Sequence, residues 1–418
     1  MLSGRKTRFN TGQIGRRSKL NHEGFNVRIH LVPRSSHQHE TSIGWEMQGN
    51  AVNADYTSSP VSYVKGKSFN RFVTIWLENT DFKKAERDPN IDFFAQKGIT
   101  LTNYFGLTHP SEPNYVAAFS GDYYGINNDD DNIIPANVST VADLLEEKDI
   151  SWGAYMEFLP STGYTGVQFK EPKTRKNGYV KKHNPPIMHS SVANNADRRA
   201  LVKNFTMFDE DLENNRLPQW NNGHDTSVTY AGEWLRDWLE PLLDNPHFIN
   251  NTLVLITFDE NENYAKQNRV FSILLGDVIP KDLIGTEDDA YYNHYSEIST
   301  VEANWQLSTL GRYDVGANVF SIVGEKTGDK IRDPEDIDDI LNNHSYGGIF
   351  NSHHSRWAPQ PVPDTKANFA GRKVLESVRR QWGDKQANSP YKGAPLMVPT
   401  YDNPPVYPQG YRRRRRQG

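Results

Sequence analysis

Short apolar runs that end abruptly at polar side chains dominate the central part of the chain. One run spans Phe72–Leu77 and stops at Glu78, and another spans Thr252–Phe258 and stops at Asp259. Both have the length of a strand and are rich in β-branched and aromatic residues, as are strands buried on both faces of a parallel sheet. In open α/β sheets, ligand sites form outside the carboxyl ends of the strands. The pattern therefore predicts a functional site at these strand ends.

Between and after these runs, apolar residues recur at helical spacing. Helices are expected over residues 81–96, 112–120, 141–148, 200–212, 227–245 and 297–310, and further strands over 99–105, 152–158 and 270–276. Gly98, Gly121 and Gly311 stand where three of these helices should end. The alternation of strands and helices predicts an α/β fold: a three-layer sandwich with a mostly parallel central sheet and helices on both faces.

This periodicity fades at both ends of the chain. Residues 1–65 are polar and are expected to form a disordered leader, and residues 388–418, rich in Pro, Tyr and Arg, a disordered tail. The predicted domain therefore spans residues 66–387. No apolar run is long enough for a membrane span, and the basic N-terminus lacks the apolar stretch of a signal peptide.

Composition narrows the class of protein. The 418 residues carry a formal net charge of −5 and a pI near 6.2, which argues against a dedicated nucleic-acid binder. The lack of cysteine excludes disulfides, thiolate nucleophiles and zinc–thiolate sites. Four N-x-Ser/Thr sequons are compatible with a secreted glycoprotein, at Asn137, Asn204, Asn250 and Asn343.

The polar residues at the two strand ends are candidate metal ligands. Glu78 and Asn79 follow the first strand, and Asp259 and Glu260 follow the second. Carboxylate and amide oxygens suit Mg²⁺, Ca²⁺ or Mn²⁺, and a nearby histidine extends the choice to zinc or iron. We expect a divalent metal ion whose identity these residues leave open. The alternative for each pair taken alone is a helix cap or a surface charge.

A loop that follows the strand over residues 99–105 holds the candidate nucleophile. Ser111 directly precedes a predicted helix, where free backbone N–H groups bind phosphate. The alternative is a simple N-cap serine. His109, His224 and His294 are candidates for proton transfer or phosphate binding, although each alone could be a packed or capping histidine.

A basic, loop-rich insertion occupies residues 159–195. Its cationic side chains are Lys170, Lys173, Arg175, Lys176, Lys181 and Lys182. The insertion could overhang the site and attract an anionic substrate, or it could be an ordinary surface loop.

Longer motifs around these residues resemble a known family. The stretches IWLENTD, ITLTNYFGLTHPSEPNY, GHDTSVTYA, LITFDENE and YYNHYSEISTVEANW are similar to those of the fungal secreted acid phosphatases in the phosphoesterase family. That family also contains bacterial phospholipases C and shares the alkaline-phosphatase-like fold. The resemblance runs from about Gly66 to Trp382.

The resemblance implies a function and roles for particular residues. It implies an acid phosphatase that hydrolyses phosphate monoesters and works outside the cell or in the cell wall, and it leaves the oligomeric state open. Ser111 would be phosphorylated transiently, and Glu78, Asn79, Asp259 and Glu260 would hold the metal ion. His109, His224 and His294 would line the phosphate site, with Asp225 supporting His224.

Two alternatives remain open within the family. One is a phosphodiesterase of the phospholipase C type, since the leaving-group pocket is not visible in the sequence. The other is a catalytically impaired member. Members of the family usually carry an apolar strand before the Gly-His-Asp motif. In this chain, Trp220 is followed directly by Asn221-Asn222-Gly223, so that strand is missing. Its loss predicts that His224 and Asp225 are displaced.

Overall fold

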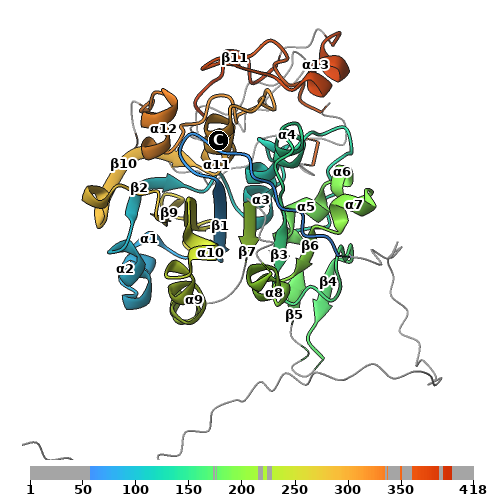
Figure 1. Ribbon diagram of the computed structural model, residues 1–418. Coiled ribbons are helices and arrows are strands. Elements are labelled where there is room, and N and C mark those ends of the chain that lie inside the picture. Colours follow the sequence, from blue (N-terminus) through green and yellow to red (C-terminus); the bar gives the residue numbers. More distant parts are fainter. Residues whose placement is uncertain are drawn as a thin grey trace, which may run out of the picture. The chain divides into compact units, whose positions relative to one another are not determined.

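Six strands form one central sheet in the computed structural model (Figure 1). The structure describes residues 57–172, 175, 177–214, 220–223, 228–334, 337, 349–350, 360–385 and 389–397, and 220–223 by backbone alone. The strands of the sheet are β1 (Arg71–Leu77), β2 (Ile99–Phe105), β7 (Trp220–Gly223), β8 (Thr252–Phe258), β9 (Arg269–Leu275) and β10 (Thr286–Asn293). Their order across the sheet is β10-β2-β9-β8-β1-β7.

The sheet is mostly parallel, as predicted. β7, β1 and β8 pair in parallel, as do β10 and β2, while β9 runs antiparallel to both of its neighbours. The reversal at β9 follows from its connection, because residues 259–268 contain no helix and so return the chain without the crossover that a parallel neighbour needs. All seven residues of β8 are buried, as its continuous apolar sequence predicted.

Helices cover both faces of the sheet, which confirms the predicted three layers. One group packs on the side of β8 and β9 and consists of α1 (Phe82–Glu86), α2 (Pro89–Ala95), α9 (Val228–Leu243) and α10 (Pro246–Ile249). The other group is centred on α11 (Tyr295–Trp305), which contacts α3 (Ser111–Ser120) and α12 (Ser321–Thr327) (Figure 1). α4 (Val141–Glu146) contacts α3 in turn.

The insertion between β3 and α9 builds smaller elements beside the main sheet. β3 (Ala154–Met156) pairs in parallel with β6 (Val202–Asn204), and β4 (Gln168–Lys170) pairs with β5 (Asn177–Val180). The helical elements here are η1 (Lys181–His183), α5 (Pro185–Met188), α6 (Ser190–Ala193), α7 (Ala196–Arg199) and α8 (Met207–Glu213). Farther along lie η2 (Lys281–Leu283), β11 (Asn368–Phe369), β12 (Arg372–Lys373) and α13 (Glu376–Trp382).

Two predicted helices are wrong in detail. The helix expected over residues 81–96 is split into α1 and α2, because the Asp88 side chain caps the backbone N–H groups of Asn90 and Ile91 and Pro89 opens a new helix. The helix expected over residues 200–212 begins instead with strand β6, which pairs with β3, and becomes helical only at α8. Pairing with a distant strand outweighed the local helical spacing there.

The shortened junction after residue 219 still forms a strand. Residues 220–223 are β7, which pairs with β1 from Phe72 opposite Trp220 to Ile75 opposite Gly223. The edge position that relatives were expected to fill with an additional apolar strand is therefore occupied by Trp-Asn-Asn-Gly. His224 and Asp225, which follow, lie outside the described residues.

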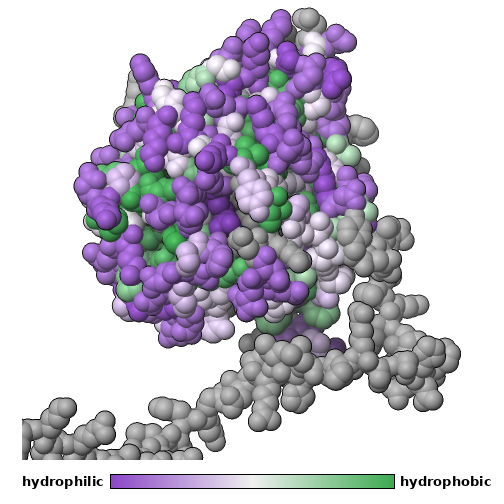
Figure 2. Space-filling view, viewed as in Figure 1, coloured by the Kyte–Doolittle hydropathy of each residue, from purple (hydrophilic) through white to green (hydrophobic). Residues whose placement is uncertain are grey.

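The packed chain extends beyond the predicted limits of the domain at both ends. Ser58 donates a backbone hydrogen bond to Ala200, and Val64 accepts one from the Trp305 indole. Near the other end, Tyr391 is buried and its hydroxyl donates to Asp122. The face drawn in Figure 2 is largely hydrophilic, with apolar residues in small groups. None of the helices in the described ranges is long and apolar enough to span a membrane.

Candidate active site

The ends of β1 and β8 bring two predicted ligand pairs together. The two strands pair in register up to Leu77 opposite Phe258, so the polar residues that follow emerge at the same level. The Asp259 N–H donates to the Leu77 carbonyl at 3.2 Å, and the Thr80 N–H donates to the Glu260 carbonyl at 3.2 Å. The sheet therefore places Glu78 beside Asp259, as the sequence predicted.

The candidate nucleophile lies in contact with the end of β8. Ser111 is the first residue of α3, and its Oγ atom donates a 2.9 Å hydrogen bond to Oε1 of Glu260. The other oxygen of that carboxylate, Oε2, is bonded to Nδ1 of His109. Glu260 thus connects two predicted site residues. The sequence analysis expected it only as a metal ligand, whereas in the structure its carboxylate bonds Ser111 and His109.

One asparagine holds the loop that presents Ser111. The Oδ1 atom of Asn114 accepts hydrogen bonds from the N–H groups of Leu107 and Thr108 at 2.8 and 3.4 Å. Its Nδ2 atom donates to the carbonyls of Thr108 and Pro110 at 2.8 and 3.3 Å. Asn114 is fully buried and three of these bonds are shielded from water, while the bond to Pro110 is partly buried. They explain why Asn follows Ser-Glu-Pro at this turn.

The two adjacent carboxyl groups after β8 have raised pKa values. Burial, with a contribution from Glu260, raises the pKa of Asp259 well above its ordinary value. Burial also raises the pKa of Glu260 to about 8, although the hydrogen bond from Ser111 lowers it in part. The Oδ2 atom of Asp259 is buried and accepts no hydrogen bond from any residue that the structure describes. This pair of carboxyl groups therefore favours a proton or a cation.

His294 lies behind the site. Its Nε2 atom donates to the backbone carbonyl of Asp259 at 2.8 Å, and its Nδ1 atom is 3.2 Å from the Tyr104 hydroxyl. The ring stacks on Trp76 with centroids 4.4 Å apart, and the side chain is fully buried. This geometry makes His294 a support for the strand end that carries Asp259.

Of the remaining predicted site residues, the structure describes Glu78 and Asn79 but not His224 and Asp225. Glu78 is half-buried and its Oε1 atom lies 3.8 Å from Nε2 of His183, whereas Asn79 is exposed at the end of β1. His224 and Asp225 fall outside the described part of the chain. The structure thus brings together Glu78, His109, Ser111, Asp259 and Glu260.

Three further residues belong to the site that the sequence analysis did not single out. His183 is buried beside Glu78, and Lys182 donates to Oδ2 of Asp129 at 2.8 Å. Burial lowers the pKa of Lys182, but Asp129, Glu78 and Asp259 outweigh it and the pKa is raised. Lys182 was noted only as part of the basic insertion, and its proximity to Asp259 favours the overhanging arrangement over an ordinary surface loop.

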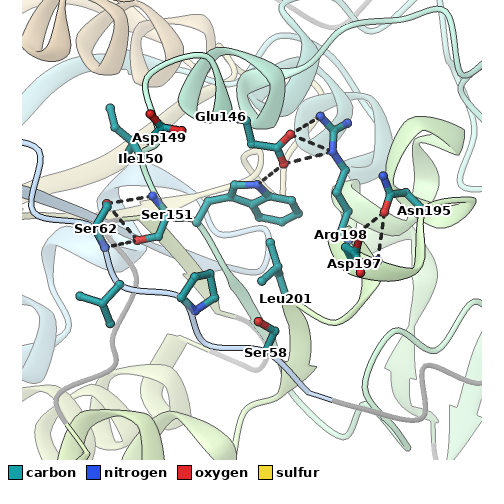
Figure 3. Close-up of a pocket in the computed structure, with 13 residues that line it drawn as sticks. Ser58, Ser62, Glu146, Asp149, Ile150, Ser151, Asn195, Asp197, Arg198 and Leu201 are labelled. Carbon is teal, nitrogen blue, oxygen red and sulfur yellow. Dashed lines mark hydrogen bonds and ion pairs between the residues drawn. The ribbon is translucent and has the colours of Figure 1, made fainter.

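A cavity lies away from the candidate active site. It has a volume of about 530 Å³ and is bordered by the segment 58–62, by the end of α4 and by α7 (Figure 3). The polar groups drawn there bond one another, since Glu146 accepts from Arg198 and from the Trp152 indole. None of the predicted site residues that the structure describes lines this cavity. Its size alone therefore gives it no chemical role.

Comparison with known proteins identifies the family and several relatives of this chain. The model of the Phosphoesterase family matches residues 81–308. An acid phosphatase of Aspergillus fumigatus is 45% identical over 355 residues, which cover 82% of this chain and 79% of that protein. A phosphate-repressible acid phosphatase of Penicillium chrysogenum is 46% identical over 355 residues, 82% of each chain. A solved protein of the alkaline phosphatase superfamily from Vibrio parahaemolyticus aligns with a TM-score of 0.37 at 12% identity, covering 59% of this chain and 68% of that one.

Proposed function

This chain belongs to the Phosphoesterase family and is a phosphatase hydrolase, and from that premise we propose that it is an acid phosphatase acting on phosphate monoesters through a phosphoserine intermediate. The observation that carries the proposal is the position of Ser111. Its hydroxyl donates to a buried carboxylate at the first turn of a helix, where backbone N–H groups favour phosphate oxygens.

The proposed reaction has two displacements at phosphorus. The Oγ atom of Ser111 attacks in line and transfers its proton to Glu260 in its ionised form, which a cation held beside it would favour. The new O–P bond forms, and the bond to the alkoxide breaks. A histidine then protonates the alkoxide. His109 suits this role because its bond to Glu260 orients the ring and Ser111 bonds the same carboxylate. Water next attacks phosphorus and gives a proton to the histidine, the bond between Ser111 Oγ and phosphorus breaks, Glu260 returns its proton to Oγ, and inorganic phosphate leaves.

The residues at the two strand ends fit a divalent cation in their chemistry. Asp259 offers a buried oxygen to which none of the described residues donates a hydrogen bond, and Glu78 and Asn79 offer hard oxygens nearby. Within the described residues, no three His, Asp or Glu side chains are grouped as a complete metal site. We propose Asp259, Glu78 and Asn79 as the residues that hold the cation, with Glu260 adjoining. A bound cation would stabilise negative charge on the phosphoryl oxygens.

The stability of the fold should depend on pH and on that cation. The pKa values of Glu260 and Glu112 are about 8 in the folded chain, against 4.5 ordinarily, mainly because both are buried. Between those values the folded chain keeps protons that the unfolded chain has lost. The free energy of unfolding is therefore expected to fall by a few kcal/mol as pH rises from about 4.5 to 8. Thermal unfolding across this range measures the loss.

The cation is tested in the same experiment. Adding Mg²⁺, Ca²⁺, Mn²⁺ or Zn²⁺ separately at pH 7 should raise the unfolding temperature for the ion that binds, since a bound cation favours ionised carboxylates. The variant Asp259→Asn should lose this response. Wild-type protein that shows no shift with any of the four ions would contradict the proposed cation site.

Substrate class and location are tested together. Cells producing the full chain are assayed in medium and extract with an aryl phosphate monoester and with a phosphocholine diester. We expect the monoester to be hydrolysed at least about tenfold faster, mostly in the medium, at acidic pH. Exposed Asn137 and Asn250, each in a sequon, support secretion with glycosylation. Faster hydrolysis of the diester would favour the phospholipase C alternative, and activity confined to the extract would contradict the proposed location.

A further inference from the structure

An acidic side chain sits directly over the N-terminus of α3. Oδ1 of Asp129 accepts a 3.0 Å hydrogen bond from the backbone N–H of Glu112, the residue after Ser111. Oδ2 of the same carboxylate accepts a 2.8 Å hydrogen bond from the Lys182 ammonium group. Both oxygens of Asp129 are therefore engaged by groups of the candidate active site.

These two partners are the groups that a phosphate bound at Ser111 would use. A backbone N–H in the first turn of a ten-residue helix and a lysine ammonium are standard ligands of a phosphate oxygen. The carboxylate resembles a phosphate in charge and in its spacing of acceptor oxygens. It also lies near the reacting centre, since its charge helps to raise the pKa values of Glu260 and Tyr264, for which burial is the larger cause.

We propose that Asp129 is a built-in competitor of the substrate, which occupies the phosphate-binding groups of the empty enzyme and is displaced when a phosphate monoester binds. This inference rests on the proposed phosphatase function of the same site. It adds a determinant of affinity, since each substrate and each released phosphate must compete with a carboxylate that is tethered to the chain.

The contacts of Asp129 suit an exchangeable group. Its side chain is 31% exposed and that of Lys182 is 27% exposed, so water screens their attraction. A second ion pair, between buried Lys181 and Asp131, connects the same loop to η1. The loop thus keeps Asp129 close to the site when its carboxylate has been displaced.

The test uses Asp129→Asn with Asp130→Asn as its matched control. Asn keeps the shape of Asp but removes the negative charge, and Asp130 is an exposed neighbour whose substitution changes the net charge equally. In a Ser111→Ala background, which prevents turnover, inorganic phosphate binding is measured by calorimetry. We expect Asp129→Asn to bind phosphate about fivefold tighter and Asp130→Asn to bind within twofold of the parent. In the Ser111 enzyme, KM for the monoester and Ki for phosphate should fall by a similar factor.

Each other result overturns the inference. Weaker phosphate binding by Asp129→Asn would make Asp129 a part of the substrate site, and an unchanged value would make it a helix cap only. Thermal unfolding of the variants identifies a loss of folding, and Asp129→Ala provides a second removal of the charge. The two proposals fail separately. If Asp129→Asn binds phosphate more tightly but the wild-type chain turns over no substrate, only the phosphatase function is refuted. If the wild-type chain is active but Asp129→Asn binds phosphate with unchanged affinity, only the role of Asp129 as a competitor is refuted.

Discussion

Ser111→Ala protein is expected to release phosphate from a monoester at least about 10⁴-fold more slowly than the wild-type chain. The substitution removes the oxygen that attacks the substrate in the first displacement. It leaves the fold intact, because the main side-chain contact of Ser111 is the bond to Glu260. Steady-state phosphate release and thermal unfolding measure the two effects. Acid quenching of wild-type enzyme during turnover should trap phosphate on Ser111.

Ser120→Ala is the matched control for this prediction. Ser120 is buried at the other end of α3, and its hydroxyl bonds the carbonyls of Val116 and Asp122, away from the strand ends. Its loss should change kcat by less than about threefold. Normal turnover by Ser111→Ala protein would show that another group attacks phosphorus, and the phosphoserine intermediate would have to be abandoned.

Asn114→Ala should reduce stability and activity together. The substitution removes four hydrogen bonds, three of them buried, and leaves the Leu107 N–H without its partner, which should lower the free energy of unfolding by about 2–4 kcal/mol. Because the loop then no longer fixes Ser111, kcat should fall by about 100-fold in the molecules that remain folded. Urea unfolding and kinetics at a temperature where the variant is folded measure the two effects.

Two variants sharpen this prediction. Asn114→Asp keeps the acceptor for Leu107 and loses the donors to Thr108 and Pro110, so its stability should lie between those of wild type and Asn114→Ala. Asn214→Ala, which removes a bond to the Glu210 carbonyl on the surface, should cost less than about 0.5 kcal/mol. A stable Asn114→Ala protein with low kcat would locate its effect in catalysis alone.

Part of the site could be predicted because it depends on strand ends. Glu78 and Asp259 follow buried apolar runs, and adjacent strands in register must place the next residues side by side. The histidines could not be ranked in this way. His109 and His294 both stand near apolar runs, yet one bonds Glu260 and the other is packed on Trp76 behind Asp259. Only side-chain packing distinguishes them.

The residues that the sequence analysis missed come from the insertion and from an acidic loop. Lys182 and Asp129 are separated by 53 positions and belong to segments without clear periodicity. Their pairing over α3 follows from the path of two loops, for which no local pattern gives a rule. The direction of β9 could not be predicted either, because an apolar run predicts that a strand is buried but does not predict its orientation.

By itself, the sequence predicted four of the six strands of the central sheet (β1, β2, β8 and β9), several main helices and the chemical groups at the strand ends, because hydrophobic spacing and turn residues act locally. The tertiary structure decided the rest: that β6 pairs with β3 where a helix was expected, that Glu260 joins Ser111 to His109, and that Asp129 covers the helix N-terminus. These contacts join residues far apart in the chain. They form because buried polar groups must find partners, and those partners are brought near only by the completed fold.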